Sequence, residues 1–282
     1  MDKGSTPDVI LIQDPPPSVM VGKNIFTGYK IARAPGRGQG LGLAAILIRD
    51  SLRFRGLRPF GPRVVAIEIS GTDGPIIMLS AYIRYGTGAG LDDLEMAVRW
   101  AKGRCPRVVV GMDGNGYSPW WGPPTVVTNP VGAMLENFIL TMDLDVVNEC
   151  DSSASFVSDM GARTWIDLTL ATPSVAYSLS NWWVDHEFFA GSDHRPIFFS
   201  IDSTPLRITV FKRKAWNEAH WGDFATSVAR GCQEESLAPR FGSGGEGTGP
   251  PRSIEAQVAS LTNVLQEAIE AHVPEKRICW AS

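Results

Sequence analysis

Acidic and amide side chains follow an apolar run in one short loop of this sequence. Asp113 and Asn115 stand in "GMDGNGYSPWWG" (111–122), a segment that directly follows the run "RVVV" (107–110) with its three valines. Side chains two residues apart in an extended segment project to the same side. A turn requires the glycines of this loop, but it does not require its acid, its amide and its two tryptophans. We therefore expect the loop to carry chemistry.

An Asp-His pair, Asp193-His194, stands at the entry to a predicted strand in "GSDHRPI" (191–197). In hydrolysis an imidazole takes a proton from water while carboxylates hold the imidazole or a metal. A capped turn is the alternative for a bare Asp-His dipeptide. Asp167 lies within the apolar run 165–170, and a buried carboxylate requires a partner because its unpaired desolvation is costly. His194 is the natural partner, so we predict an oriented Asp–His couple.

Two further polar residues lie at predicted strand ends. Asp14 suits a hard-cation ligand, with a turn carboxylate before Pro15 as the alternative. Tyr82 is a candidate for which packing in the core or at its rim is the alternative. Sheet proteins bind ligands at strand ends, so these residues together favour one shared site.

Short apolar runs supply the strands that must position these side chains. They span residues 8–12, 41–49, 63–70, 75–83, 107–112, 165–170 and 195–201. Helices are predicted over 91–103, which ends at Gly103, and over 129–144. Many strands with few helices between them favour a layered α/β sandwich over strict βαβ alternation. The glycine-rich segment 35–40 lacks the Gly-Lys-Ser/Thr of a phosphate-binding loop and is interpreted as a hairpin loop.

The composition is that of a globular protein with a substantial core. The chain has 282 residues, 44% of them hydrophobic and 20% charged, which indicates one or two domains. A net charge of −4 gives no global attraction to nucleic acid, so such a partner needs a local basic surface. The four cysteines are far apart, which argues against a disulfide framework and favours a reducing compartment. No apolar stretch has the length of a membrane span, and no signal peptide is evident.

The composition changes near residue 202. We predict a first domain over 1–202 and a linker over 203–282, with helices at about 216–231 and 253–272. Residues 241–251 are typical of a flexible connection, and Ser253 is the predicted N-cap of the second helix.

The ordered motifs resemble the endonuclease/exonuclease/phosphatase superfamily. In chain order they are Gln13-Asp14, Ala81-Tyr82, Asp113-x-Asn115, Ser118-Pro119-x-Trp121-Gly122, Ile166-Asp167-Leu168-Thr169-Leu170 and Ser192-Asp193-His194-Arg195-Pro196-Ile197. Within that superfamily, "SPWWG" and "IDLTL" resemble the apurinic-type endonuclease domain of non-LTR (LINE-like, R1/jockey-type) retrotransposon polyproteins. The resemblance covers about residues 8–201, and the tail resembles the segment that joins this domain to a reverse transcriptase.

The resemblance implies a four-layered α/β sandwich with two facing mixed sheets flanked by helices. It implies a DNA phosphodiester hydrolase that uses Mg²⁺ or Mn²⁺ and nicks double-stranded DNA. The 3′-hydroxyl so formed would prime reverse transcription of the element's RNA, which would be a partner only through the reverse transcriptase. It also implies a monomer that acts in the nucleus, without a membrane partner.

Residue roles follow from the resemblance position by position. Asp14 is the expected metal ligand, and Asp193 is expected beside the metal. His194 is expected to act as a base or to contact the phosphate, held in place by Asp167.

The remaining expected roles concern the substrate. Asp113 and Asn115 would orient the attacking water and the scissile phosphate, and Tyr82 would donate to that phosphate. The candidate DNA contacts are Arg84, Arg163 and Ser118, although scattered arginines usually mark a solvated surface.

Three departures from the family pattern define the alternatives. The sequence begins at what matches the second strand of the family, so a first strand with its active-site Asn is expected to be missing. Asp14 stands where the family has Glu, and Tyr117 stands where it usually has His. One alternative is therefore an inactive, truncated remnant with at most nucleic-acid binding. Another is a hydrolase of phosphorylated lipids or inositols, against which the Ser118–Gly122 block argues.

Overall fold

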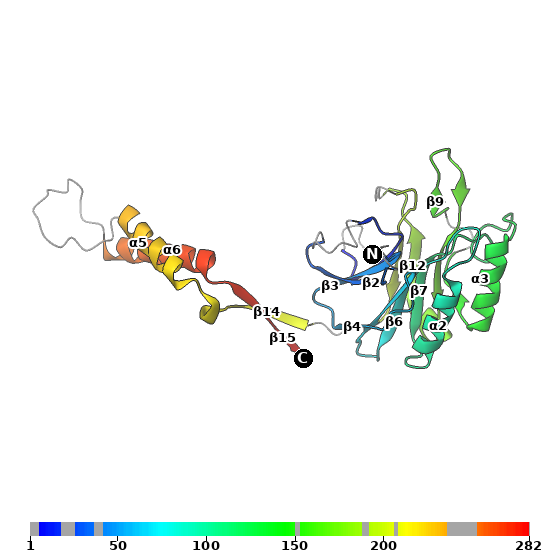
Figure 1. The fold of residues 1–282 in the computed structure, drawn as a ribbon, viewed down its shortest axis with the longest axis horizontal. Coiled ribbons are helices and arrows are strands. Elements are labelled where there is room, and N and C mark those ends of the chain that lie inside the picture. The colour runs from blue at the N-terminus through cyan, green and yellow to red at the C-terminus, as the bar shows by residue number, and fades with distance from the viewer. Residues whose placement is uncertain are drawn as a thin grey trace, which may run out of the picture. The chain divides into compact units, whose positions relative to one another are not determined.

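The computed structural model describes residues 6–17, 26–36, 42–149, 153–187, 192–205, 208–235 and 253–281. The chain divides into two compact units, Met1–Ile208 and Thr209–Ala281. Each unit is described by itself below (Figure 1).

A six-stranded mixed sheet forms the centre of the first unit. Its order is β4 (Phe54–Gly56), β5 (Val64–Ile69), β6 (Ile76–Tyr82), β7 (Val108–Asp113), β11 (Asp167–Ala171) and β8 (Asp145–Val146). Strands β6 and β7 are parallel, and the other neighbours are antiparallel. A parallel pair needs a crossover, which contains helix α2 (Leu91–Lys102).

A second, antiparallel sheet faces the first. It has the order β1 (Val9–Gln13), β3 (Ala44–Arg49) and β2 (Tyr29–Arg33). Alternate residues of β3, Ile46 and Ile48, pack into one core with Ile67, Met78 and Val109 of the larger sheet. The antiparallel pair β12 (Leu179–Val184) and β13 (Ile197–Ile201) adds Leu179, Phe199 and Ile201 to this core, and the short helix α4 (Pro173–Ala176) adds Val175.

Helices α2 and α3 (Pro130–Thr141) cover the other face of the six-stranded sheet. Figure 1 shows them on the side of β6 and β7 opposite to β2 and β3. Buried Leu94 and Leu135 of these helices share a core with Leu79 and Val110. Asn129 caps α3 by accepting a hydrogen bond from the Gly132 N–H. Two facing sheets with flanking helices are thereby confirmed, although the smaller sheet is antiparallel rather than mixed.

All seven predicted strands are present as β1, β3, β5, β6, β7, β11 and β13. Three further strands, β2, β4 and β12, were not expected because polar residues interrupt their apolar pattern. A small hairpin, β9 (Phe156–Val157) and β10 (Arg163–Thr164), was also missed. The predicted hairpin loop 35–40 lies largely outside the described residues.

The second unit is a pair of helices joined to a two-stranded ribbon. Strands β14 (Ile208–Lys214) and β15 (Glu275–Ala281) form the ribbon, whereas we expected no strand here. The helix expected at about 216–231 begins later, because a 3₁₀ turn at Trp216–Glu218 precedes α5 (Trp221–Glu234). Helix α6 (Ile254–His272) begins after Ser253, which accepts from the Ala256 N–H. In the described part of the chain, no helix has the length and apolarity that a membrane crossing requires.

A buried polar contact joins the two sheets of the first unit. Ser80 of β6 is fully buried, and its hydroxyl donates to the Ile12 carbonyl at 2.9 Å. The amide of Gln13 donates to the Ser80 oxygen at 2.9 Å and to the Gly111 carbonyl at 3.2 Å. These bonds fix β1 against the strand ends where the polar candidates lie.

Replacement of Ser80 by alanine is expected to destabilise the first unit by about 1–3 kcal/mol, because it leaves the Ile12 carbonyl without this donor. Urea denaturation measures the change. The exposed Ser180→Ala on β12 is the matched control and should stay within about 0.5 kcal/mol of the parent. Equal losses in the two variants would contradict the structural role of this contact.

Candidate active site

The register of two antiparallel strands places two acids side by side. Asp113 ends β7, Asp167 begins β11, and the two residues are directly paired across the strands. Asp113 is only 6% exposed. Like charges in directly opposed positions destabilise a sheet, so this pair requires a proton or a positive partner.

His194 supplies such a partner. Its Nδ1 lies 2.9 Å and 3.1 Å from the two carboxylate oxygens of Asp167, and its Nε2 lies 4.0 Å from Oδ2 of Asp113. With the Nδ1 proton donated to Asp167, Nε2 faces Asp113 and the strand ends. The predicted Asp167–His194 couple is present in this geometry, and Asp113 joins it.

The hairpin β9–β10 holds the segment that carries His194. Phe156 forms an isolated bridge with His194, and its ring meets the imidazole edge-on with the ring centres 5.0 Å apart. The Asp193 carbonyl accepts from the Val157 N–H at 3.0 Å, and the Arg195 N–H donates to the Ser155 carbonyl. Sequence reasoning missed Phe156, since an aromatic residue in "SASFVSD" gives no sign of a histidine neighbour.

Asn115 binds Asp113 and joins two loops. Its Nδ2 donates to Oδ2 of Asp113 and to the Ile83 carbonyl, both at 3.0 Å, and its N–H donates to Oδ1 of Asp113 at 3.2 Å. Its φ of 50° lies in the left-handed region, which Asn tolerates better than most residues. The Ile83 N–H donates in turn to the Asp113 carbonyl at 2.8 Å. The loops after β6 and β7 are therefore fastened together beside the acids.

Burial and charge shift the pKa values of these groups. Burial, followed by the charge of Asp167, raises the pKa of Asp113 to about 7, against the opposing effects of His194 and Asn115. Burial disfavours the imidazolium of His194, but the hydrogen bond and charge of Asp167 and the charge of Asp113 outweigh it and raise its pKa to about 9. Burial and nearby Asp113 raise the pKa of Tyr82, so its hydroxyl remains a proton donor at neutral pH.

The cluster offers ligands for a divalent cation. One ligand atom each from Asp113, Asp167 and His194 can be chosen so that all lie within 4.8 Å of one another. Carboxylate oxygens are preferred by Mg²⁺ and Mn²⁺, and imidazole is compatible with Mn²⁺. A cation would also favour ionised Asp113, whose charge burial and Asp167 now oppose. The residues present therefore fit such an ion.

The two acids predicted as metal ligands lie at the edge of this group. Asp14 is exposed at the end of β1, has a left-handed φ of 44°, and is near enough to raise the pKa of Tyr82. Asp193 is exposed and contributes to the raised pKa of His194. Neither belongs to the three-residue cluster, and their role as ligands stays a prediction.

The candidate DNA contacts differ in exposure. Arg84, in the loop after β6, and Arg163, on β10, are exposed. Ser118 is fully buried and donates to Oε1 of Glu136 at 2.6 Å, which leaves it no surface for DNA. Its predicted DNA contact is therefore wrong: the hydroxyl stabilises the inside of its own loop.

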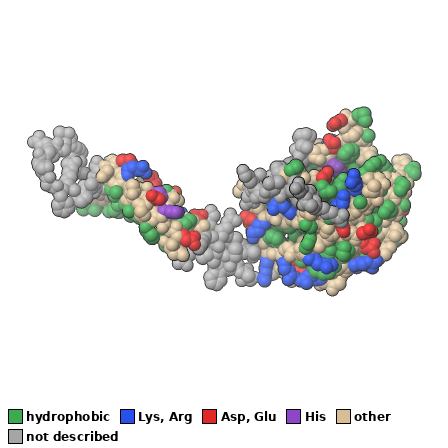
Figure 2. Space-filling view, viewed as in Figure 1, with side chains coloured by type: hydrophobic (Ala, Val, Ile, Leu, Met, Phe, Trp, Pro, Cys, Tyr) green, Lys and Arg blue, Asp and Glu red, His purple; other side chains and the backbone are tan. Residues whose placement is uncertain are grey.

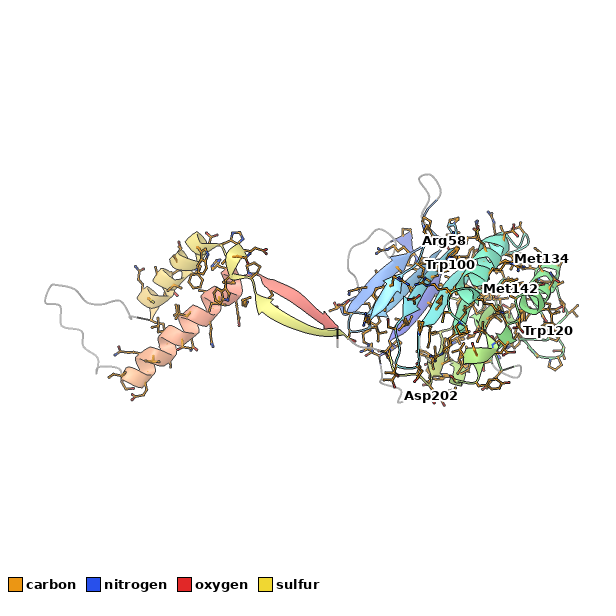
Figure 3. The ribbon with its side chains drawn as sticks, turned by 90° about the horizontal axis from the view of Figure 1, so that it is seen from below. Arg58, Trp100, Trp120, Met134, Met142 and Asp202 are labelled. Carbon is orange, nitrogen blue, oxygen red and sulfur yellow. The ribbon has the colours of Figure 1, made fainter. Side chains whose placement is uncertain are left out.

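Lys and Arg side chains gather along the lower edge of the first unit in the face that Figure 2 shows, away from hairpin β9–β10. Two arginines, Arg55 and Arg104, pair with Glu68 at 2.9 Å and 2.6 Å. Arg58 lies over the ring of Phe60, 4.9 Å from its centre, and beside Trp100 (Figure 3). These arginines are thus engaged with an acid or with aromatic rings.

The fold of two facing sheets is shared with solved endonucleases, and it supports the resemblance of the motifs to the endonuclease/exonuclease/phosphatase superfamily. Residues 76–198 match the family model described as endonuclease-reverse transcriptase. No curated protein sequence matches the chain.

Solved structures share this fold. The endonuclease domain of TRAS1, a telomere-specific non-LTR retrotransposon, is 22% identical with a TM-score of 0.58, covering 69% of this chain and 86% of that one. The AP endonuclease LMAP from Leishmania major is 15% identical with a TM-score of 0.55, covering 68% and 77%. The 3′ phosphatase NExo from Neisseria, bound to product DNA hairpin, is 17% identical with a TM-score of 0.53, covering 71% and 90%. At these low sequence identities, the similarity to the solved structures shows only that the folds are alike.

In protein freed of divalent cations, the His194 imidazole is expected to titrate above its ordinary pKa of 6.5, and Asp167→Asn is expected to lower that pKa. NMR of the imidazole nitrogens measures both values, with His194→Gln to assign the signal. A raised folded-state pKa means that this group's contribution to folding is full below pH 6.5 and fades as the pH rises toward about 9. Titration at or below 6.5 in the parent protein would contradict the described pairing.

Proposed function

We propose that the first unit is a metal-dependent DNA endonuclease of the non-LTR retrotransposon type. It nicks one strand of double-stranded DNA and leaves a 3′-hydroxyl that primes reverse transcription. The observation that carries this proposal is the cluster of Asp113, Asp167 and His194 within the fold of a phosphodiester hydrolase superfamily.

The side chains have complementary parts in this reaction. Asp167 fixes the imidazole of His194, whose Nε2 accepts a proton from water when neutral and donates to a phosphate oxygen when protonated. Tyr82 donates its hydroxyl proton to the phosphate, and Asn115 keeps the Asp113 carboxylate in one orientation. Mg²⁺ or Mn²⁺ held by the two carboxylates would neutralise phosphate charge and increase the acidity of a bound water. Positioning and charge neutralisation are what phosphodiester hydrolysis requires.

The proposed partner is double-stranded DNA. The similar structure from Neisseria is bound to a DNA hairpin, and the similar TRAS1 domain belongs to a telomere-specific retrotransposon. Exposed Arg84 and Arg163 are the proposed phosphate contacts. The element's RNA would be met only through a reverse transcriptase, and the nucleus is the proposed place of action of a monomer.

A second candidate function is DNA binding without hydrolysis. It is favoured by Asp14, which replaces the glutamate of the family and lies outside the cluster of potential ligands. If the shorter side chain of Asp14 does not reach the cation, the metal site has one carboxylate ligand fewer. Cation binding would then be weaker, while the DNA-binding surface would remain.

Asp113→Asn and His194→Ala are each expected to lower the nicking rate on supercoiled plasmid with Mg²⁺ or Mn²⁺ by roughly 100-fold or more, because each removes a group of the cluster. EDTA should abolish nicking by the parent protein. The exposed Asp202→Asn and His220→Ala are matched controls and should keep the parent rate. A parent protein that nicks no faster than the two cluster variants would refute hydrolysis at this site, and retained DNA binding would then support the second candidate.

Arg84→Ala and Arg163→Ala are each expected to reduce the steepness of the salt dependence of DNA binding, by roughly 0.9 in the log–log slope for each phosphate that the protein no longer neutralises. Fluorescence anisotropy of a labelled duplex over a salt series measures this slope. Arg55→Ala removes an exposed arginine that pairs with Glu68 on β5, and it serves as the control. An unchanged slope in both site variants would exclude these arginines as phosphate contacts.

A further inference from the structure

The first residue of β11 has a strand neighbour on one side only. Asp167 is paired with Asp113 of β7, whereas β8 on the other side pairs only with the last two residues of β11. A strand end without a neighbour has unpaired backbone groups and opens easily. Since Asp167 holds the imidazole of His194, another group must fix its backbone.

The side chain of Asn148 takes the place of a strand at this point. Its Oδ1 accepts from the Thr169 N–H at 2.7 Å, and its Nδ2 donates to the Asp167 carbonyl at 2.9 Å. The Val147 N–H, just beyond β8, donates to the Thr169 carbonyl at 2.9 Å, so the Asn148 amide continues this row of hydrogen bonds toward the cluster. A carboxamide can do this because it offers the acceptor and the donor of a peptide group.

These two hydrogen bonds are shielded from water. Asn148 and Thr169 are both buried, and the Thr169 hydroxyl accepts from Nε1 of the buried Trp182 at 3.0 Å. The partners also fix the orientation of the amide, since an N–H can only donate and a carbonyl can only accept. Loss of the Asn148 amide would therefore leave two buried backbone groups of β11 unpaired.

A second side chain holds the other backbone group of Asp167. The Ser155 hydroxyl accepts from the Asp167 N–H at 3.3 Å, and the Ser155 carbonyl accepts from the Arg195 N–H at 2.6 Å. The N–H and the carbonyl of Asp167 are thus both bound by side chains, and they set the direction of its Cα–Cβ bond. The carboxylate beyond that bond lies 2.9 Å and 3.1 Å from Nδ1 of His194.

We propose that Asn148 is a positioning residue, which fixes the Asp167 carboxylate and through it the imidazole of His194. This role rests on the proposed function, because it concerns the reaction at the same cluster. A displacement of about 1 Å in a reacting group can lower a rate roughly 100-fold. Partners that orient the ligands of a site typically contribute about 10–100-fold to activity.

Asn148→Ala is expected to lower the kcat of plasmid nicking by roughly 10-fold or more and to leave KM nearly unchanged, because the proposed DNA contacts lie on other elements. In the Asp167→Ala background the same substitution should have little further effect on kcat, since the carboxylate that it positions is absent. A role in stability alone predicts equal losses in both backgrounds.

A second measurement does not depend on nicking. In EDTA, the Nδ1 proton that His194 shares with Asp167 should give a ¹H NMR resonance far downfield of the backbone amides, and His194→Gln assigns it by its loss. Asn148→Ala should shift or broaden this resonance. Asn148→Ser, whose hydroxyl can bond at most one of the two strand groups, should show milder losses in both measurements and serves if the alanine variant does not fold.

Thr172 provides the matched control at the other end of β11. It is buried, and its hydroxyl accepts from the Val108 N–H at 2.9 Å and donates to the Pro106 carbonyl at 2.6 Å. Thr172→Val should lower the urea midpoint of unfolding by an amount comparable with Asn148→Ala, while it keeps the parent kcat and the parent resonance.

An unchanged kcat and resonance in both Asn148 variants, or equal losses in Thr172→Val, would overturn the positioning role and leave the proposed nicking intact. Absence of nicking by the parent protein would overturn the proposed function. The resonance would then still decide whether Asn148 holds Asp167 against His194.

Discussion

The pairing of Asp113 with Asp167 across β7 and β11 is the constraint on which the rest of the site depends. Two carboxylates in directly opposed positions repel each other, and burial of Asp113 makes the repulsion more costly. The sheet fixes their register, since a shift of one residue would turn one side chain to the other face. The acids therefore remain together only if positive charge or a proton joins them. His194 meets this demand, and a divalent cation at the same oxygens would meet it as well.

The surrounding loops hold these acids and His194 in place. Asn115 binds both oxygens of Asp113 and also the Ile83 carbonyl, so the orientation of the acid and the spacing of two loops are set together. On the other side, the hairpin β9–β10 fixes His194 through Phe156 and the backbone bonds of the neighbouring residues. Local hydrogen bonds thus stabilise the two acids at the strand ends against their mutual repulsion. The same bonds fix the start of the loop after β6, which carries Arg84.

Much of this arrangement could be predicted from the sequence, and the exceptions have physical reasons. Apolar runs bounded by turn residues identified seven strands, and the buried acid of "WIDLTL" correctly indicated His194 as its partner. The register that brings Asp113 opposite Asp167 could not be predicted, because it depends on how distant strands pair. The burial of Ser118 was missed for a related reason. The carboxylate that accepts its hydroxyl hydrogen bond belongs to Glu136, which lies on a helix later in the chain. Strands such as β2 and the ribbon of β14 and β15 were missed because their alternation is broken by charged residues, so only pairing reveals them.

If the cluster directs water against a DNA phosphate, the oxygen of that water must appear in the product at the nick. Supercoiled plasmid is nicked in ¹⁸O-enriched water with Mg²⁺ or Mn²⁺, and the ends at the nick are examined by mass spectrometry. Attack by water on phosphorus with release of the 3′ oxygen predicts one ¹⁸O atom in a 5′-phosphate and an unlabelled 3′-hydroxyl. Nicks that carry a 3′-phosphate, or a 5′-phosphate without the label, would contradict this attack by water at the cluster.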